Sequence, residues 1–368
     1  MPAAALLSEI PSPSASLRLA APVKVAIAGA TGAVGREMIA CLEKRRFPVA
    51  SLRLFASQRS AGRTIGYRGE SLTVEPLTEA ALQGQDLVLF ATDAATSRRF
   101  APVAAALGAV VIDNSSAFRM DPAAALVVPE VNGQVLQGHG GIIANPNCCA
   151  AIAVLALAPL HRAAGLTRVI ASTYQAASGA GAEAMAELLD STSAYLNGRP
   201  YRPKALAHPY AFNLFSHDSA IDPETGANDE ELKIVHELRR LLDAPDLRVG
   251  VTCVRVPVLR AHAIALTVEL ERPLTPEDAL ALLARSPGLK LAHDPAANRF
   301  PMPSDAAGRD EVLVGRVRRD PGDPTGRTLM LFLAGDQLLK GAALNAVQIA
   351  ESLLPQGEGG ARAGGVGG

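Results

Sequence analysis

Tryptophan is absent from this 368-residue sequence, and aromatic residues make up only 4% of it. Few side chains are therefore available to stack on nucleic-acid bases. The formal net charge is only -1 at pH 7, so no basic excess attracts nucleic acid or an acidic membrane surface. The longest apolar run, residues 148–160, is shorter than the roughly 18 residues of a membrane-spanning helix. We therefore expect small-molecule partners, with no nucleic acid and no membrane.

Cysteine is also scarce, with four residues at positions 41, 148, 149 and 253. Their spacing contains no C-x-x-C pair, which argues against a disulfide framework and a structural zinc site, so we expect no metal. Residues 1–22 have neither the basic start nor the sustained apolar stretch of a secretion signal. We expect a cytoplasmic protein in which 1–22 form a disordered extension and the glycine-rich residues 356–368 form a flexible tail.

Short apolar segments indicate an α/β protein. The chain is 49% hydrophobic and 19% charged, as in globular proteins, and it exceeds the roughly 250–300 residues that one core supports. Apolar runs at 23–30, 51–57, 86–92 and 109–116 are separated by segments long enough for a helix or crossover. This alternation predicts a Rossmann-type, doubly wound parallel sheet up to about residue 145.

A different pattern begins after residue 165, where alternating or apolar segments are separated by helical ones. It predicts an α+β second domain with an antiparallel or mixed sheet. Strands are expected at 167–176, 247–259, 262–271 and 327–336, and helices at 182–198, 229–243 and 275–286. A closing helix at 340–354 has a period of 3.6 residues, and we expect it to return to the first domain.

The segment GATGAVG, residues 29–35, follows the first expected strand and precedes a helix. Glycines at 29, 32 and 35 let the backbone approach a pyrophosphate at the helix N-terminus, which favours nucleotide binding over a simple tight turn. An NAD site would place an acidic residue about 20 positions further on. Arg59 and Ser60 occupy that region instead, and their donors suit a 2′-phosphate, so the sequence favours NADP.

The segment NPNC, residues 145–148, precedes a long apolar run. Asn147 is a suitable N-cap, and it places Cys148 in a first turn, where free N–H groups and the helix dipole lower the pKa of a thiol. The same amides can bind the oxyanion that forms when a thiolate attacks a carbonyl. Taken alone, Cys148 and Cys149 also fit buried packing. Helical geometry turns them about 100° apart, so we expect only Cys148 to face a pocket.

Arg255 and His262 are the next candidates, in the segment RVPVLRAH. In one unbroken strand their odd spacing would direct the two side chains to opposite faces. Pro257 lies between them and cannot donate a ladder hydrogen bond. We therefore predict that the strand breaks or bulges near 257–261 and that both side chains reach one site. The alternative is a surface arginine and a loop histidine with no joint role.

Several ordered motifs together resemble the aspartate-semialdehyde dehydrogenase family, from Val23 to about Leu354. They are GATGAVG, the loop SQRSAG, DNSSAFRM (113–120), PEVN (129–132), NPNC, YQAASGAG (174–181), RVPVLRAH and GDQLLKGAALNAVQIAE (335–351). The resemblance implies the reversible conversion of L-aspartate 4-semialdehyde, phosphate and NADP⁺ to L-4-aspartyl phosphate and NADPH. The family runs the reaction reductively, in lysine, threonine, methionine and diaminopimelate biosynthesis.

The resemblance also implies roles for individual residues. Cys148 is the acyl-thioester nucleophile, His262 is the general acid and base, and Gln175 aligns the substrate. The implied ligands of substrate and phosphate are Arg255, Glu230, Arg119 and Lys233. The implied contacts with NADP are Gly29, Thr31, Gly32, Ala33, Val34, Gly35, Arg59, Ser60, Ser178, Gly179 and Gln337.

Some of these roles compete with simpler explanations. Glu230 and Lys233 have the i,i+3 spacing of a solvated salt bridge, and Asp229 or Glu231 remains an alternative ligand for the substrate amino group. The position of Arg119 also favours a ligand role, because it follows a strand end, where ligands gather in open α/β sheets. The sequence departs from the family at Cys149, where serine is common, and this adds a second oxidisable thiol.

The resemblance implies an NADP-binding domain at 23–147 plus 341–355 and a catalytic and dimerisation domain at 148–340, in a homodimer or homotetramer. Two alternative functions remain. One is N-acetyl-gamma-glutamyl-phosphate reductase, although its Pro-Gly-Cys-Tyr-Pro context is absent here. The other is a non-catalytic NADP-binding redox sensor that uses Cys148 and Cys149 as its switch.

Overall fold

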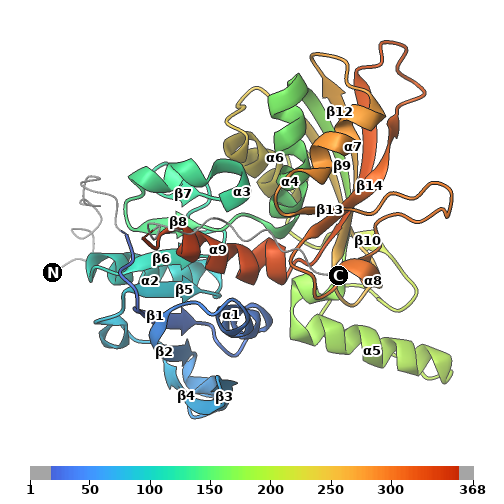
Figure 1. Cartoon of the computed structure of the whole chain (residues 1–368). Coiled ribbons are helices and arrows are strands. Elements are labelled where there is room, and N and C mark those ends of the chain that lie inside the picture. Colours follow the sequence, from blue (N-terminus) through green and yellow to red (C-terminus); the bar gives the residue numbers. More distant parts are fainter. Residues whose placement is uncertain (1–17, 356–368) are drawn as a thin grey trace.

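The computed structural model describes residues 18–355, which form two β-sheets with helices packed against them (Figure 1). Residues 1–17 of the predicted extension and the whole predicted tail, 356–368, lie outside the described residues. The extension was predicted to reach residue 22, but Leu19 is buried, and its N–H donates a hydrogen bond to the Leu353 carbonyl oxygen at 3.0 Å. This apolar side chain and its backbone bond anchor the chain from residue 19.

The N-terminal half forms an eight-stranded sheet in the order β3-β4-β2-β1-β5-β6-β8-β7. All neighbouring strands are parallel except β3 and β4, which pair antiparallel at one edge. The predicted doubly wound sheet is confirmed. Its strands are β1 (Val23–Ala28), β2 (Val49–Ala56), β3 (Thr64–Tyr67), β4 (Glu70–Pro76), β5 (Leu87–Phe90), β6 (Val110–Asp113), β7 (Ala125–Leu126) and β8 (Ile142–Ala144).

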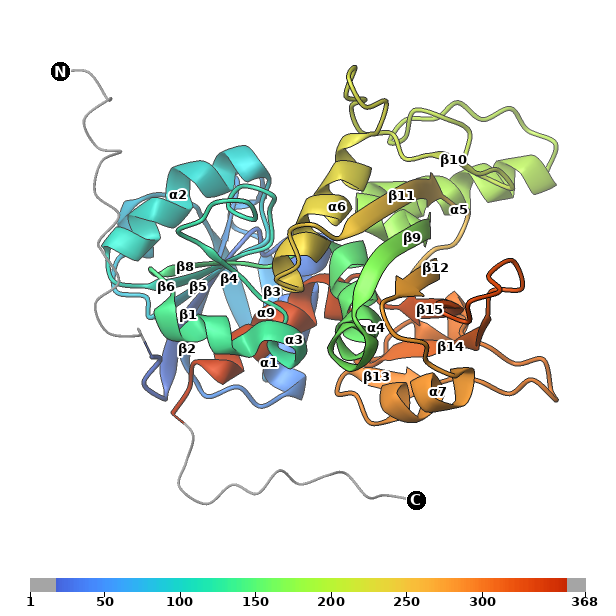
Figure 2. The same ribbon diagram turned by 90° about the horizontal axis from the view of Figure 1, so that it is seen from above.

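Helices cover both faces of this sheet (Figure 2). The helix α2 (Ala94–Ala106) lies on one face, while α1 (Ala33–Lys44), α3 (Pro129–Asn132) and α9 (Leu344–Ser352) lie on the other. The helix α9 shares one apolar core with α1 and the sheet, through residues such as Met38, Leu344 and Val347. The predicted return of the closing segment to the first half is confirmed.

The start of that closing segment differs from the prediction of one regular helix. Residues Leu339–Ala343 form a π-helical turn before α9 begins. Contacts with distant segments accompany this widened turn. The buried Lys340 Nζ donates hydrogen bonds to Glu130, Asn345 and Gln348 at 2.6–2.9 Å. Gly341 lies so close to Cys148 that a Cβ added there would be 2.7 Å from the Cys148 Cβ. Such π-turns are frequent at functional sites.

The second half forms a seven-stranded sheet in the order β10-β11-β9-β12-β15-β14-β13. Of the two predicted types, antiparallel or mixed, the sheet is mixed. The pairs β11 with β9 and β13 with β14 are parallel, and the others are antiparallel. The strands are β9 (Leu166–Gln175), β10 (Phe215–Ser216), β11 (Arg248–Arg255), β12 (His262–Leu270), β13 (Leu289–Leu291), β14 (Val312–Arg319) and β15 (Thr328–Gly335).

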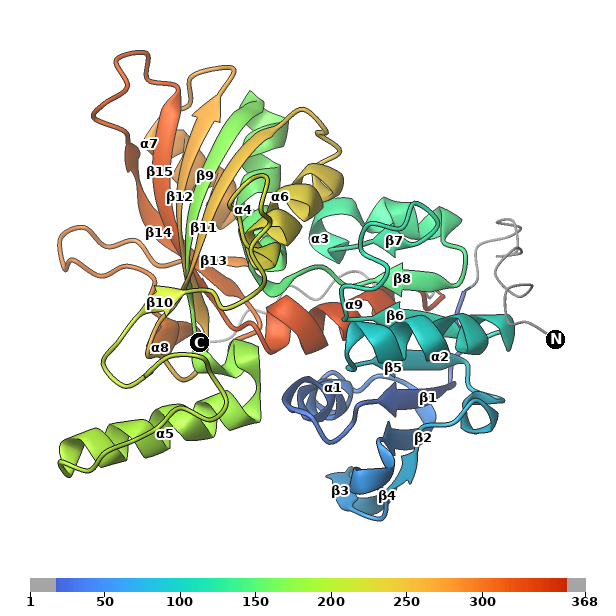
Figure 3. The ribbon, with the colours of Figure 1, turned by 180° about the vertical axis from the view of Figure 1, so that it is seen from behind.

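Three helices pack on one face of this sheet, in an apolar core shared with its strands (Figure 3). They are α4 (Cys148–Ala164), α6 (Asp229–Leu241) and α7 (Pro276–Ala284). The opposite face presents Ile170, Tyr174, Met330 and Phe332, which are exposed or half-buried. The helix α5 (Ala182–Leu196) extends away from the body of the molecule, and the short α8 (Pro303–Ala306) precedes β14. Within residues 18–355 we find no helix of the length and hydropathy needed to cross a membrane.

Candidate active site

The glycine-rich turn lies at the carboxyl ends of β1 and β2. The N–H groups of Gly29 and Ala30 both donate to the Phe55 carbonyl oxygen, at 2.8 and 3.0 Å. Gly29 has a φ of +87°, and a Cβ there would lie 2.2 Å from the Ala91 carbonyl oxygen. A Cβ at Gly35 would lie 2.3 Å from the Gly29 carbonyl oxygen. Close packing leaves no room for a side chain at Gly29 or Gly35. Gly32 is the N-cap of α1 and has no side chain that could accept hydrogen bonds from the first N–H groups of the helix. The end of α1 can therefore accept a phosphate.

The turn after β2 lies beside this glycine-rich turn. Residues Gln58–Ser60 form a short 3-10 segment directly after β2, with Arg59 exposed. Arg59 has no salt-bridge partner in the part of the chain that the structure describes. The other predicted contacts in this region, Thr31, Ala33 and Val34, lie at the start of α1, and Val34 borders the cavity described next.

A cavity of about 430 Å³ contains most of the other predicted residues. Its volume is in the range of small-molecule sites. Val34 of α1 and Arg119 of the loop after β6 line it together with residues of the second half, so it lies where the two halves of the chain meet. The predicted residues that line it are Val34, Arg119, Cys148, Gln175, Ser178, Gly179, Glu230, Lys233, Arg255 and Gln337. Gln337 donates a hydrogen bond from its Nε2 to the Ser178 hydroxyl, which links the two motifs that contain them.

Cys148 is the first residue of α4, as predicted. The Asn147 side-chain oxygen caps this helix by accepting hydrogen bonds from the N–H groups of Cys149 and Ala150, at 2.9 and 3.3 Å. The pKa of Cys148 is lowered well below the usual thiol value. Hydrogen bonding with the Cys149 thiol is the main cause; burial acts in the opposite direction, and the charge of His262 adds to the lowering. Cys148 is therefore poised to react as a thiolate.

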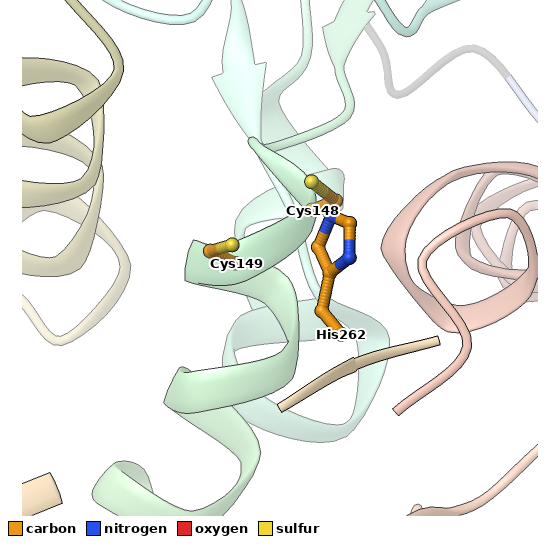
Figure 4. A group of neighbouring side chains, drawn as sticks. All are labelled: Cys148, Cys149 and His262. Atoms are coloured by element: carbon orange, nitrogen blue, oxygen red, sulfur yellow. The ribbon is translucent and has the colours of Figure 1, made fainter. Parts of the chain in front are cut away.

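Cys149 lies in the apolar core and is fully buried, whereas Cys148 borders the cavity. The expectation that only one of them faces the pocket is confirmed. The pKa of Cys149 is raised well above the usual value, first by its hydrogen bond with Cys148 and then by burial. This raised pKa favours the neutral thiol, whose S–H can donate to the neighbouring thiolate. Figure 4 shows the two cysteines on the first turn of α4 with His262 beside Cys148.

His262 begins β12, and it is completely buried. Its Nδ1 accepts a hydrogen bond from the Ala176 N–H at 2.9 Å, so the ring proton of the neutral imidazole is on Nε2. That Nε2 has no hydrogen-bond partner among residues 18–355. The side-chain ligand atoms of Cys148, Cys149 and His262 lie within 4.8 Å of one another. A metal would need a free lone pair on Nε2, so this tautomer favours proton transfer over metal binding.

Arg255 and His262 reach the site from two separate strands. The strand β11 ends at Arg255 and β12 begins at His262, which confirms the predicted break at 257–261. Both strands flank β9, where Arg255 pairs with Gln175 and Ala263 pairs with Tyr174. The arginine, the glutamine and the histidine therefore lie at the same end of three adjacent strands. The Nε of Arg255 is buried and has no partner among the described residues, so a carboxylate can accept from it.

Glu230 lines the cavity, whereas the two alternative acids, Asp229 and Glu231, do not. Its Oε1 accepts hydrogen bonds from Asn147 Nδ2 at 2.7 Å and from Gln175 Nε2 at 3.1 Å. Asp229 is exposed, and Glu231 completes the capping box of α6 with Asn228. The Lys233 Nζ lies 3.9 Å from Glu230 Oε2, and Lys233 borders the same cavity. The geometry therefore favours Glu230 over the two alternative acids.

Glu237 is a buried residue of the site that the sequence analysis did not identify. One of its carboxylate oxygens accepts from Arg119 Nη1 at 3.2 Å, and the other accepts from the Asn147 backbone N–H. Carbonyl oxygens of Asn114 and Asn145 accept from the remaining sides of the Arg119 guanidinium, at 2.7 and 2.9 Å. Glu237 thus holds both the predicted phosphate ligand and the residue that caps the nucleophile's helix. Its only sequence signal is a position two turns after Glu230 on α6.

Two family models match the chain. Residues 24–139 match "Semialdehyde dehydrogenase, NAD binding domain", and residues 157–340 match "Semialdehyde dehydrogenase, dimerisation domain". The chain is 49% identical over 336 residues to an aspartate-semialdehyde dehydrogenase of Synechocystis sp., covering 91% of this chain and 98% of that protein. It is 44% identical over 337 residues to the protein of that name from Bacillus subtilis, covering 89% and 96%.

A solved structure from Vibrio cholerae resembles this fold with a TM-score of 0.86 at 40% sequence identity. The match covers 90% of this chain and 98% of that one. That protein is described as aspartate semialdehyde dehydrogenase II complexed with ASA.

Proposed function

The chain belongs to the aspartate-semialdehyde dehydrogenase family, and on that premise we propose how its own residues perform the reaction. The chemistry is the reductive dephosphorylation of L-4-aspartyl phosphate to L-aspartate 4-semialdehyde, and its reverse. The observation that carries the proposal is the Cys148 thiol at the start of α4, beside the buried Nε2 of His262.

We propose that the Cys148 thiolate attacks the acyl carbon of aspartyl phosphate, forming a thioester and releasing phosphate. The N–H of Cys148 and the positive end of the α4 dipole stabilise the oxyanion of this step, since the Asn147 side chain already accepts from the N–H groups of Cys149 and Ala150. NADPH held at the glycine-rich turn, Gly29 to Gly35, would supply the hydride that reduces the acyl group. Hydride addition leaves a hemithioacetal alkoxide, which His262 stabilises and protonates from Nε2; His262 takes this proton back as the carbonyl re-forms, the carbon–sulfur bond breaks and the Cys148 thiolate leaves. The side chain of Gln175 aligns the acyl group.

The same cavity offers separate sites for the two anions of the reaction. We propose that Arg255 binds the substrate carboxylate through its unpartnered Nε and adjacent donors, while Glu230 faces the amino group. We propose that Arg119 and Lys233, which line the same cavity, bind the phosphate. We also propose the division of the chain into an NADP-binding part, 23–147 plus 341–355, and a catalytic and dimerisation part, 148–340.

The function is tested by following NADPH formation from L-aspartate 4-semialdehyde with and without phosphate. Turnover that requires phosphate is expected, with at least about 100-fold lower kcat/KM for the semialdehyde of N-acetylglutamate, because one extra methylene and an acetyl group must be accommodated. A higher kcat/KM for the N-acetylglutamate semialdehyde would instead support the N-acetyl-gamma-glutamyl-phosphate reductase alternative. Cofactor binding without turnover of either aldehyde would support a redox sensor.

The preference for NADP over NAD is proposed from the exposed Arg59 and from Ser60, beside the glycine-rich turn. Replacing Arg59 by alanine is expected to raise the KM for NADP⁺ about 10- to 100-fold, because a charge-assisted hydrogen bond to the 2′-phosphate contributes roughly 1.5–3 kcal/mol. The KM for NAD⁺ should stay within about twofold. The matched control is Arg63→Ala, another exposed arginine of the same loop. An equal change for both cofactors would contradict the role of Arg59.

A homodimer or homotetramer is proposed from the uncovered face of the second sheet. The match to a dimerisation domain covers this sheet. On β9, Ile170 and Tyr174 are 40% and 37% exposed. Met330 and Phe332 are half-buried on β15, which is separated from β9 by the single strand β12. Apolar side chains gathered on one open sheet face favour burial against a second copy.

Replacing Glu237 by glutamine is expected to weaken both phosphate binding and the fold. Glutamine carries no charge to pair with Arg119, and its amide cannot accept hydrogen bonds through both terminal atoms. We expect the KM for phosphate to rise about 10-fold and the free energy of unfolding to fall by about 3 kcal/mol, as for other broken buried ion pairs. Steady-state kinetics and urea unfolding measure the two effects. Glu277→Gln, at an exposed position on α7, should change neither.

A further inference from the structure

His217 lies in the substrate cavity, and neither the sequence motifs nor the proposed reaction assigns it a role. It directly follows β10, whose residues Phe215 and Ser216 pair with Arg255 and Val254 at the end of β11. The His217 N–H also donates to the Cys253 carbonyl oxygen at 2.9 Å. The backbone thus fixes the imidazole beside the arginine that is proposed to bind the substrate carboxylate.

The imidazole forms a hydrogen bond with that arginine. Arg255 Nη2 lies 2.9 Å from His217 Nε2. A guanidinium has donors only, so Nε2 must accept, and the neutral ring then carries its proton on Nδ1. The Nδ1 lies 3.2 Å from the Ser219 hydroxyl oxygen and 3.3 Å from the Ser219 backbone nitrogen. In this tautomer the hydroxyl oxygen is the acceptor and the Ser219 N–H is only a close neighbour of Nδ1. The same hydroxyl oxygen also accepts from the Glu230 N–H at 3.2 Å. A continuous set of hydrogen bonds therefore joins Arg255, His217, Ser219 and Glu230.

This arrangement leaves the guanidinium with a defined orientation. Its Nη1 donates to the Ala176 carbonyl oxygen at 3.2 Å, and its Nη2 is held by His217. The Nε stays buried and unpartnered among residues 18–355, and Asp218 is the nearest acid, 3.7 Å from Nη2. With Nη1 and Nη2 both held, the planar guanidinium presents a fixed set of donors, including Nε, to a bound carboxylate.

The neutral state of His217 is favoured by its surroundings. Burial is the main cause of its lowered pKa, and the charge of Arg255 adds to it, while Glu230, Asp218 and Cys148 act in the opposite direction. A protonated ring would lose its acceptor and face the guanidinium with a like charge.

We infer that His217 is a positioning residue for the substrate carboxylate. Its Nε2 fixes the Arg255 guanidinium, and its contact with Ser219 connects that guanidinium to the first turn of α6, which carries Glu230. This inference rests on the proposed role of Arg255 as the carboxylate ligand. It deepens the proposed function, because it identifies what sets the distance between the two groups that bind the amino acid end of the substrate.

The first test compares three variants by steady-state kinetics. His217→Ala is expected to raise the KM for L-aspartate 4-semialdehyde about 10-fold or more, with the KM values for NADP⁺ and phosphate within about twofold. His217→Gln should restore most of the affinity, because its amide oxygen can accept from Arg255. His236→Ala, which removes an exposed histidine on α6, is the control and should change nothing.

The second test places His217→Ala in an Arg255→Lys background. Lysine cannot present the same planar fork, so the loss of His217 should have no further effect on the aldehyde KM there. An unchanged aldehyde KM in His217→Ala, a parallel rise in all three KM values, or full additivity with Arg255→Lys would each overturn the inference. These outcomes leave the function intact, whereas a wild-type chain that forms no NADPH from this aldehyde would refute the proposed function itself.

Discussion

Replacing Cys148 by alanine is expected to reduce phosphate-dependent NADPH formation by about 10⁴-fold or more, because the variant cannot form a thioester. Losses of this size follow removal of the nucleophile or its base from other covalent catalysts. Little change in thermal stability is expected, because Cys148 borders the cavity and does not fill the core. Kinetics with aspartate semialdehyde and a melting curve test both parts.

Two other cysteines provide controls for this result. Cys149→Ser keeps a hydrogen-bond donor next to the thiolate and should retain turnover within about 10-fold. Cys41→Ala removes a buried thiol of α1, in the other half of the chain, and should leave kcat unchanged. If Cys148→Ala retained turnover and Cys149→Ser lost it, the nucleophile would have been assigned to the wrong cysteine.

Replacing His262 by glutamine is expected to reduce kcat by about 10²–10⁴-fold, the usual contribution of a positioned general acid and base. Glutamine still has an amide N–H but cannot transfer its proton. The melting temperature reports separately on the loss of the buried contact between Nδ1 and the Ala176 N–H. A kcat within twofold of the wild type would contradict the role of His262.

The same variant should also change the reactivity of the nucleophile. The charge of His262 contributes to the lowered pKa of Cys148, so its removal should raise that pKa and leave less thiolate at neutral pH. The rate of alkylation by iodoacetamide, followed against pH, should shift to higher pH in His262→Gln. The slower alkylation should be recovered as the pH is raised.

Local rules predicted much of this site. The cap at Asn147 and the first-turn position of Cys148 follow from helix termini, which few residues determine. The odd spacing between Arg255 and His262, with Pro257 between them, required a strand break, and the two strands that result flank β9. Alternating and apolar runs were enough to predict four strands of each sheet, because burial imposes these patterns on each strand separately.

Other features depend on contacts between distant segments. Glu237 appears on α6 as one acid among several, and only the docking of α6 against the N-terminal half brings it to Arg119. His217 follows a strand of two residues, too short to produce a pattern. The antiparallel edge formed by β3 and β4 was also not anticipated. The π-turn at 339–343 depends on Lys340 reaching Glu130, more than 200 residues away in sequence. Such partners have no local sequence signal.

The central claim is most directly tested by trapping the covalent intermediate. The protein is mixed with L-aspartate 4-semialdehyde and NADP⁺ in the absence of phosphate. Oxidation then forms a thioester, which accumulates because no phosphate is present to cleave it. Digestion and tandem mass spectrometry then locate the aspartyl adduct, with fragmentation between residues 148 and 149 distinguishing the adjacent thiols. The account predicts an adduct on Cys148 that disappears when phosphate is added. An adduct on Cys149, or NADPH formation with no protein adduct at any time, would contradict it.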